Sequence, residues 1–342
     1  MISRMRASRF VNTGRALCLA LSLSLPATAA IADAQFQRWV GQFRATALNS
    51  GVSRNVFDRA FAGITAPDPE VLRLATSQPE FTAPVWQYFD NQVNEQSVTT
   101  GRHMAKQHRR TLEAIEKRFG VDRHILLGIW SIESRYGEAL SNPRVMRNIV
   151  SSLATLAYAD KRRQKYATQQ LIAALKIVQN GDVSVKQLTG SWAGAMGHTQ
   201  FIPTSYQTWA VDLDGNGKRD IWNSIPDALG SAANLLKQNG WRTGHAWGYE
   251  VVLPAGRKFP AGRMTLAQWQ AIGVVRANGQ AYPRPNDQAE LKVLDGREGP
   301  AFLVLHNFNV LKRYNSSDRY AIAVGLLADQ IAGHNPPRRD WN

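Results

Sequence analysis

The chain has 342 residues, which is enough to bury a large core in one elaborate domain or in two to three small ones. It carries a formal net charge of +15 and a single cysteine. This composition excludes a small scaffold held by disulfides and a metal site built from thiolates.

Residues 1–34 have the pattern of a secretory leader. Arginines come first, and the apolar stretch Ala16–Leu25 and the small-residue site Ala32-Asp33-Ala34 follow. The apolar stretch is too short for a membrane span and is interrupted by Pro26. It also lacks the signature of a lipid-anchoring cysteine. We therefore expect an exported periplasmic protein that is not a lipoprotein, with a mature chain beginning near Gln35.

The expected mature chain remains strongly basic. Four basic residues and one acidic residue lie in the leader, which leaves 37 basic and 25 acidic residues and a formal charge of +12. In an exported protein, this charge favours anionic cell wall and membrane surface as partners over nucleic acid. Lys and Arg are scattered without a basic-aromatic repeat, so plain solubility remains an alternative explanation.

Helical spacing of apolar residues dominates the chain. Residues 35–120 show it throughout, which predicts an N-terminal helical domain. Further helical patterns cover three segments, namely Asn148–Gln179, Pro226–Asn239 and Ser317–Gly333.

The pattern of residue types changes after Trp247. Short β-branched or apolar runs, separated by Pro, Gly and Asn, predict a small β-containing insert at residues 249–300. We expect a mainly α (α+β) fold in which this insert interrupts a core that is formed by residues 121–248 and completed by residues 301–342.

The strongest local signal is the segment Ile125–Gly137. Leu126, Ile129, Trp130 and Glu133 fall at positions i, i+3, i+4 and i+7 of one helix. Glu133 therefore continues an apolar stripe that must face the interior. A carboxyl group held against Trp and Ile is poorly solvated, which favours its protonated form. Such a group can protonate a leaving oxygen as a general acid. The alternative is a glutamate that merely reaches solvent from a helix end.

The segment Ser191–Tyr206 combines glycines with neutral polar and aromatic side chains. Gly194 and Gly197 let the backbone approach a ligand or another helix closely. Neutral hydrogen-bonding groups beside flat rings suit a sugar, and this segment supplies Ser191, Gln200, Phe201 and Tyr206. The alternative is a tight turn before a helix that starts with proline.

The segment Asp212–Asn223 has the spacing of a calcium loop. The expected metal ligands are Asp212, Asp214, Asn216, Lys218 through its backbone carbonyl, and Asp220. Asn223 replaces the bidentate glutamate at position 12, which predicts weak affinity or a ligand from elsewhere. We expect a structural Ca²⁺ here, and the alternative is an acidic turn held by its own hydrogen bonds.

The ordered motifs together resemble one family, the soluble lytic transglycosylases of the membrane-bound lytic transglycosylase B type, whose core is similar to that of goose-type lysozyme. The likeness covers nearly all of the expected mature chain. The motifs that carry it are Gln78–Phe81, Glu133–Gly137, Ser152–Ala157, Gly194–Gly197 with Gln200-Phe201, and Arg313–Ser316 followed by Tyr320.

The resemblance implies cleavage of the glycan strands of peptidoglycan. Glu133 would be the single acid and base, and the product would be a 1,6-anhydro sugar formed without water or a cofactor. The residues implied to line the sugar cleft are Ser191, Gln200, Tyr314, Asn315 and Tyr320, with Met196 and Phe201 beneath it. Two alternatives remain: a hydrolytic muramidase of the same fold, and a peptidoglycan-binding protein without turnover.

Overall fold

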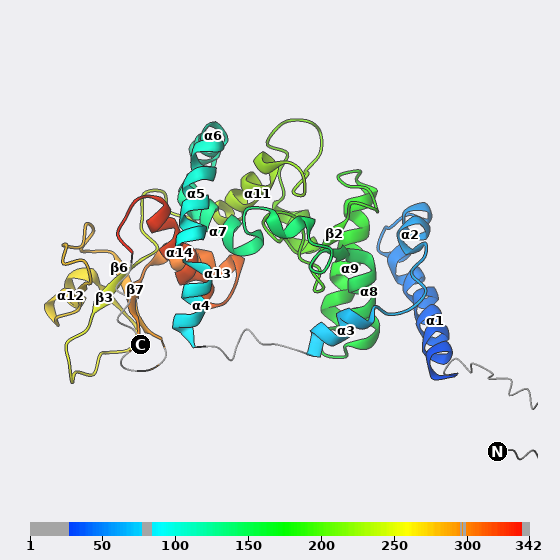
Figure 1. Ribbon diagram of the computed structural model, residues 1–342, viewed down its shortest axis with the longest axis horizontal. Helices are drawn as coiled ribbons and strands as arrows, with labels where there is room; N and C mark the ends of the chain where they lie inside the picture. Colours follow the sequence, from blue (N-terminus) through cyan, green and yellow to red (C-terminus); the bar gives the residue numbers. More distant parts are fainter. Residues whose placement is uncertain (1–26, 77–83, 295, 297–298, 337–342) are drawn as a thin grey trace, which may run out of the picture.

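The computed structural model describes residues 27–76, 84–294, 296 and 299–336 (Figure 1). The predicted leader lies mostly outside these residues, and only its end falls in the first helix. The motif Gln78–Phe81 also lies outside the described residues. Within the described ranges, no helix is both long and apolar enough to cross a membrane.

The N-terminal helices contribute to two regions of the molecule. The first region contains α1 (Ala27–Asn49), α2 (Arg54–Phe61) and α3 (Pro69–Thr76), which pack against α8 (Ile149–Ala159) and α9 (Gln164–Gln179). The second contains α4 (Val85–Gln92), α5 (Glu95–Gln107) and α6 (Arg109–Phe119), which pack around α7 (Arg123–Ser134), α11 (Ile225–Gln238) and α14 (Asp318–Ile331). Figure 1 shows α1 and α2 beside α8 and α9, with α4 and α5 beside α7 and α14. Residues 35–120, expected as one domain, are thus shared between two regions.

The helical pattern expected from Asn148 to Gln179 forms two helices, the hairpin α8–α9, and not one continuous helix. The carboxylate of Asp160 accepts the backbone N–H groups of Arg162 and Arg163 and also pairs with the Arg163 guanidinium. An aspartate that bonds to nearby backbone groups stabilises a turn instead of a continuing helix. The chain therefore reverses after α8, and both helices bury apolar faces against each other.

The expected small β-containing unit is confirmed. It contains β3 (Gly248–Val252), β4 (Arg263–Thr265), α12 (Leu266–Ala271), β5 (Val275–Arg276), β6 (Gln288–Val293) and β7 (Ala301–Val304). The sheet order is β4-β6-β7-β3-β5, and every neighbouring pair is antiparallel. The unit has its own core around the fully buried Trp269. Its last strand lies beyond residue 300, in the segment expected to return to the core.

Short elements complete the described chain. They are the 3₁₀ helix η2 (Glu138–Ser141), the two-stranded pair β1 (Arg147–Asn148) with β2 (Thr189–Gly190), α10 (Pro203–Trp209) and α13 (His306–Tyr314).

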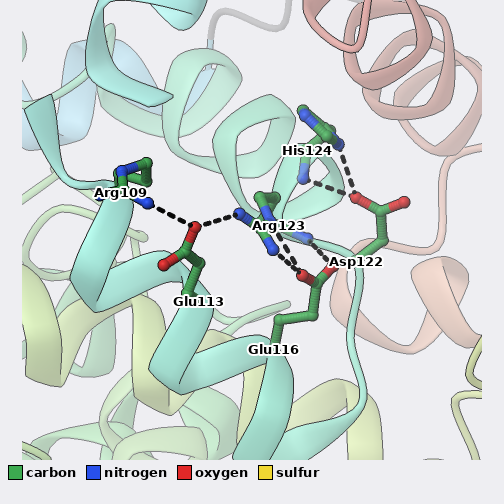
Figure 2. Close-up of polar contacts among 6 residues, drawn as sticks. All are labelled: Arg109, Glu113, Glu116, Asp122, Arg123 and His124. Atoms are coloured by element: carbon green, nitrogen blue, oxygen red, sulfur yellow. Dashed lines mark hydrogen bonds and ion pairs between the residues drawn. The ribbon is translucent and has the colours of Figure 1, made fainter. Parts of the chain in front are cut away.

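A cluster of charged side chains anchors the start of α7 to α6 (Figure 2). Arg123 pairs with Glu116 and with Glu113, and Glu113 also accepts a hydrogen bond from Arg109 at 3.3 Å. The Asp122 carboxylate accepts the backbone N–H of His124 at 2.7 Å, which caps the helix. The first turn of α7 is therefore held both by its cap and by the neighbouring helix.

Close packing between α7 and α14 forms the centre of the molecule. Both helices are buried along most of their length. A Cβ atom placed on Gly128 of α7 would lie 2.8 Å from the backbone oxygen of Val324 in α14. Only a glycine therefore permits this separation of the two helices.

We predict that Gly128→Ala lowers the free energy of unfolding by about 1–3 kcal/mol, because the added methyl group overpacks against a backbone atom. Gly41→Ala is the matched control, since Gly41 is an exposed helical glycine with open space around its Cβ position. That change should stabilise the protein by about 0.5–1 kcal/mol. Urea unfolding followed by circular dichroism measures both, and equal effects would contradict the assigned packing.

Candidate active site

Glu133 lies in the last turn of α7 and is held from another helix. The Tyr320 hydroxyl, from α14, donates a hydrogen bond of 2.6 Å to Glu133 Oε1. Tyr320 is buried, with 3% of its surface exposed. Burial, followed by the nearby Glu133 charge, raises the pKa of Tyr320 well above its usual value. The phenol therefore keeps its proton near neutral pH and acts as a donor to the carboxylate.

The backbone turns sharply directly after Glu133. Arg135, Tyr136 and Gly137 all have positive φ, at 50°, 57° and 94°. For the two non-glycine residues this conformation is costly, and it persists only where the surroundings hold it. The Tyr136 hydroxyl donates to the Ser97 carbonyl of α5 at 2.9 Å, which supplies such a restraint. The carboxyl-bearing turn is thus the end of α7, as the sequence predicts.

The segment 191–201 forms a tight hairpin beside this helix end. Met196 and Phe201 exchange two backbone hydrogen bonds of 2.9 and 3.0 Å, and both side chains are buried. The Ser191 hydroxyl accepts the Ala195 N–H at 3.1 Å. Gln200 has a φ of 49°, and its side-chain amide donates to the Gly197 carbonyl at 2.8 Å. Met196 and Phe201 thus form the floor of the segment, while Ser191 and Gln200 are half-buried.

Three aromatic rings connect the hairpin to the carboxyl group. Phe201 meets Tyr314 edge to face at 5.8 Å, and Tyr314 stacks on Tyr320 at 6.4 Å with an interplanar angle of 6°. The Tyr314 hydroxyl donates to the Thr199 carbonyl at 2.5 Å. The structure therefore joins Glu133, Tyr320, Tyr314 and Phe201 in one continuous set of contacts.

Asn315 and Tyr206 occupy different environments. Asn315 is exposed at the end of α13, where its side-chain oxygen accepts the Ser317 N–H at 3.1 Å. Tyr206 is fully buried, and its hydroxyl donates to the Arg219 carbonyl at 2.5 Å, with the Arg219 guanidinium over its ring. The Tyr206 ring is thus unavailable to a ligand in this structure, in contrast to its expected place beside a sugar. Tyr206 instead supports the acidic loop formed by Asp212–Asn223.

His198 is a residue of the site to which the sequence assigns no role. Its Nδ1 atom accepts a hydrogen bond of 3.1 Å from the Trp130 indole, and its carbonyl accepts one of 2.7 Å from the Ser134 hydroxyl. Burial lowers the pKa of His198 to about 4, although the Asp220 charge opposes the shift. The ring is therefore neutral at pH 7 with its proton on Nε2. No local pattern could have indicated these contacts, because Trp130 is 68 residues away along the chain.

The acidic loop that follows is rich in internal hydrogen bonds. Asp212 accepts the backbone N–H groups of Gly215, Asn216 and Gly217, and the Asn216 side chain accepts the Lys218 N–H at 2.9 Å. The carboxylates of Asp212, Asp214 and Asp227 can each place one oxygen within 4.8 Å of the other two. Three hard oxygen ligands at such spacing fit a calcium ion.

Asp227, which is not in the expected ligand set, joins Asp212 and Asp214 in this cluster. The Asp220 carboxylate accepts the backbone N–H groups of Trp222 and Asn223, so it serves the turn. Asp227 is fully buried, and its carboxylate accepts the N–H groups of Leu213, Asp214 and Asp220 at 2.8–3.2 Å. The 12-residue spacing missed it because it lies beyond the loop, in the first turn of α11. In the sequence, the feature that could have pointed to Asp227 is its position shortly after Ser224, the residue that caps α11.

A large cavity elsewhere does not coincide with these groups. It has a volume of about 470 Å³ and lies between the sheet and the end of α14, where Trp247, Arg276 and Asp329 line it. Asp329 follows Tyr320 by nine residues on α14, which corresponds to about 13 Å along the helix. The contacts around Glu133 therefore identify the candidate active site better than cavity size does.

Comparison with known proteins places these features in a family. Residues 35–329 match the family model described as Transglycosylase SLT domain. The chain is 32% identical over 244 residues to membrane-bound lytic murein transglycosylase B of Escherichia coli K12. That alignment covers 70% of this chain and 65% of the relative, so the chain spans slightly less than two thirds of that protein.

Solved structures share the fold over most of the chain. SltB3 from Pseudomonas aeruginosa, in complex with NAG-NAM-pentapeptide, is 47% identical with a TM-score of 0.85, covering 90% of this chain and 82% of that one. The Escherichia coli lytic transglycosylase Slt35, in complex with calcium, is 29% identical with a TM-score of 0.72, covering 86% and 92%. The fold is therefore the lysozyme-like one of lytic transglycosylases, as the resemblance implied.

We predict that Asp227→Ala lowers the free energy of unfolding by about 1–3 kcal/mol, since three backbone N–H groups lose their acceptor. Asp58→Ala is the matched control: Asp58 pairs with Arg44 on the surface, and such a pair contributes at most about 1 kcal/mol. Urea unfolding in the presence of chelator separates this structural effect from metal binding. A loss of unfolding free energy in Asp227→Ala that is no larger than the loss in Asp58→Ala would contradict the role of Asp227 as the acceptor that holds the loop.

Proposed function

Because the chain belongs to the Transglycosylase SLT domain family, we propose that it is a lytic transglycosylase of peptidoglycan. The reaction is cleavage of the β-1,4 bond between N-acetylmuramic acid (MurNAc) and N-acetylglucosamine (GlcNAc), with formation of a 1,6-anhydro-MurNAc end. The observation that carries the proposal is the Glu133 carboxyl at the end of a buried helix, where it accepts a hydrogen bond from the buried Tyr320.

Relatives of known structure support the choice of substrate. SltB3 is 47% identical to this chain and has been crystallised with NAG-NAM-pentapeptide and with NAG-anhNAM-pentapeptide. The second ligand carries the anhydro sugar that a transglycosylase produces. The neutral polar and aromatic residues around Glu133 also match a glycan substrate in kind.

A single carboxyl group is sufficient for this reaction. In the first step, Glu133 donates its proton to the glycosidic oxygen, and the bond between MurNAc C1 and that oxygen breaks. In the second step, the Glu133 carboxylate takes the proton of the MurNAc 6-hydroxyl, whose oxygen forms a bond to C1. Glu133 is then protonated again, GlcNAc leaves with a free 4-hydroxyl, and no water is consumed. The substrate's own hydroxyl thus replaces the second carboxylate that most glycosidases use.

Tyr320 orients the acid during this cycle. Its hydroxyl donates to Oε1 at 2.6 Å and so fixes the direction of the carboxyl group that would exchange the proton with substrate. The Tyr314 ring stacks on Tyr320 and restrains its rotation. Because the pKa of each tyrosine is raised by burial and by the Glu133 charge, neither competes with Glu133 as a proton donor.

Two other functions fit the same fold. A hydrolytic muramidase would use water in place of the 6-hydroxyl, and a peptidoglycan-binding protein would retain the cleft without turnover. Product analysis separates all three, because only the transglycosylase leaves anhydro ends.

The acidic loop is proposed to bind a structural calcium ion. The supporting observations are the convergent oxygens of Asp212, Asp214 and Asp227 and the Slt35 structure in complex with calcium. The loop begins directly after α10, which follows the hairpin of the site, so an ordered loop would stabilise one side of the site. The ion takes no part in the proton transfers.

A location in the cell envelope follows from the substrate. The curated relative is named as membrane-bound, and the basic charge of this chain suits an anionic wall. We further propose that the leader at residues 1–34 directs export of the chain and that the mature protein is released into the periplasm without a lipid anchor. Its partner there is the glycan strand of peptidoglycan.

We predict that Glu133→Gln reduces the release of anhydro-muropeptides by about 100- to 10,000-fold while leaving the fold intact, because the amide cannot supply a proton. Glu138→Gln is the matched control, since Glu138 is exposed at the start of η2. Mass spectrometry of digested peptidoglycan measures the products. Wild-type turnover by correctly folded Glu133→Gln protein would overturn the assignment, and reducing-end products alone would indicate the muramidase.

We predict that calcium raises the melting temperature and that a chelator lowers it. An ion that binds only the folded state stabilises it by about 2.7 kcal/mol at roughly 100 times its dissociation constant. Asp214→Ala should abolish this response. Asp220→Ala should retain it, because the Asp220 carboxylate serves the turn and lies outside the cluster. A melting curve that millimolar calcium leaves unchanged would mean that the loop is only a polar turn.

A further inference from the structure

We propose that His198 is a positioning residue for Glu133. The expected effect on catalysis rests on the proposed function. The role assigned to the His198 side chain is to keep Glu133 in the position where it accepts the hydrogen bond from Tyr320. In this proposal, His198 acts through the residues that surround the acid on α7 and α14 and not by contact with the substrate.

The first connection reaches Glu133 through its own helix. Trp130 precedes Glu133 by almost one turn, and its indole donates to His198 Nδ1 at 3.1 Å. Ser134 directly follows Glu133 and donates its hydroxyl to the His198 carbonyl at 2.7 Å. Trp130 is only 1% exposed, so its N–H depends on a protein acceptor. Trp130 and Ser134, which precede and follow Glu133 on α7, are therefore both bonded to His198.

The second connection reaches Glu133 through α13 and α14. The carbonyl of Thr199, the residue after His198, accepts the Tyr314 hydroxyl at 2.5 Å. Tyr314 stacks in parallel on Tyr320, and Tyr320 donates to Glu133 at 2.6 Å. The contacts thus form a closed ring that runs from Glu133 down α7 to His198 and returns through the two tyrosines.

The backbone of His198 is itself restrained, so it can serve as a fixed point. Its N–H donates to the Ile221 carbonyl at 3.0 Å. A Cβ atom on the preceding Gly197 would lie 2.4 Å from that same carbonyl oxygen. On the other side, a Cβ atom on Gly137 would lie 2.4 Å from the imidazole ring. The ring therefore fills the space beneath the sharp turn that follows Glu133.

The chemistry of the ring limits which residues can replace it. The position needs a hydrogen-bond acceptor at the place of Nδ1, together with bulk against Gly137. Asparagine can present its carbonyl oxygen near the place of Nδ1, whereas leucine has similar volume and no acceptor. His198→Leu leaves the Trp130 N–H without a partner in a buried site, and His198→Asn does not.

The test compares these two variants on soluble glycan oligomers released from peptidoglycan. We expect His198→Leu to reduce kcat by about 10- to 100-fold with KM changed less than about twofold, because a displaced acid slows the chemical step more than binding. His198→Asn should recover kcat to within about threefold of wild type. His306→Leu is the control, since the His306 ring also bonds to a backbone carbonyl, that of Gly240, at the far end of α13 from Tyr314. Its kcat should equal that of wild type.

A readout that does not depend on activity is the indole N–H resonance of Trp130 in ¹⁵N-labelled protein, assigned with Trp130→Phe. It should move upfield in His198→Leu and stay near its wild-type position in His198→Asn. If His198→Leu does not fold, Trp130→Phe tests the same bond from the donor side and should reduce kcat without raising KM.

Three results would overturn the proposal. The first is an unchanged kcat in His198→Leu or, where that variant does not fold, in Trp130→Phe. The second is an equal loss of kcat in the leucine and asparagine variants, and the third is a Trp130 resonance that is the same in all variants. Absence of anhydro products from wild-type protein would instead overturn the proposed function. In that case, the Trp130 resonance still decides whether His198 holds the helix end.

Discussion

The hydrogen bond between Tyr320 and Glu133 ties together the ends of two buried helices, and the surrounding structure is arranged so that these ends meet. Glu133 is half-buried, and a carboxyl group that loses part of its hydration is costly unless a hydrogen-bond donor compensates it. The donor comes from α14, 187 residues later in the chain. The close approach of α7 and α14 at Gly128 brings the two groups within reach.

The β-containing unit lies in the chain between α11 and α13 and helps to set the position of α14. Trp247, at the entry to the sheet, packs its indole against Gly325, where a Cβ atom would lie 2.2 Å from the ring. The same indole donates to the Asp329 carboxylate at 3.1 Å, near the end of α14. Desolvation raises the pKa of Asp329 to about 6, and the hydrogen bond from Trp247 opposes this shift. The sheet thus restrains one end of α14 while Glu133 contacts the other.

Periodic patterns in the sequence predicted the parts of the molecule that local burial determines. The stripe of Leu126, Ile129 and Trp130 is buried, and Glu133 lies at the end of that helix. The pattern failed at Asp160, where one polar residue reverses the chain although apolar spacing continues on both sides. The calcium-type spacing did not point to Asp227 for a related reason. It counts residues along a loop, whereas the cap of α11 brings Asp227 to Asp212 and Asp214. The partners of His198 and Tyr320 are set by tertiary packing, which no periodicity encodes.

The contacts around Glu133 separate the group that exchanges a proton from those that hold it. Burial raises the pKa of Tyr314 and Tyr320, and it lowers that of His198 to about 4. All three are consequently neutral near pH 7, and each uses its fixed protonation state to make one directed hydrogen bond: two phenols donate and one imidazole nitrogen accepts. A neutral network can remain in place while the carboxyl group changes its charge twice in one catalytic cycle, because no member has to release or gain a proton in response. Because His198, Tyr314 and Tyr320 are neutral, they can be withdrawn from water beside a catalytic group without the cost of desolvating a charge. The only group in the network that must carry charge is Glu133, and it lies where the backbone turns away and α7 ends.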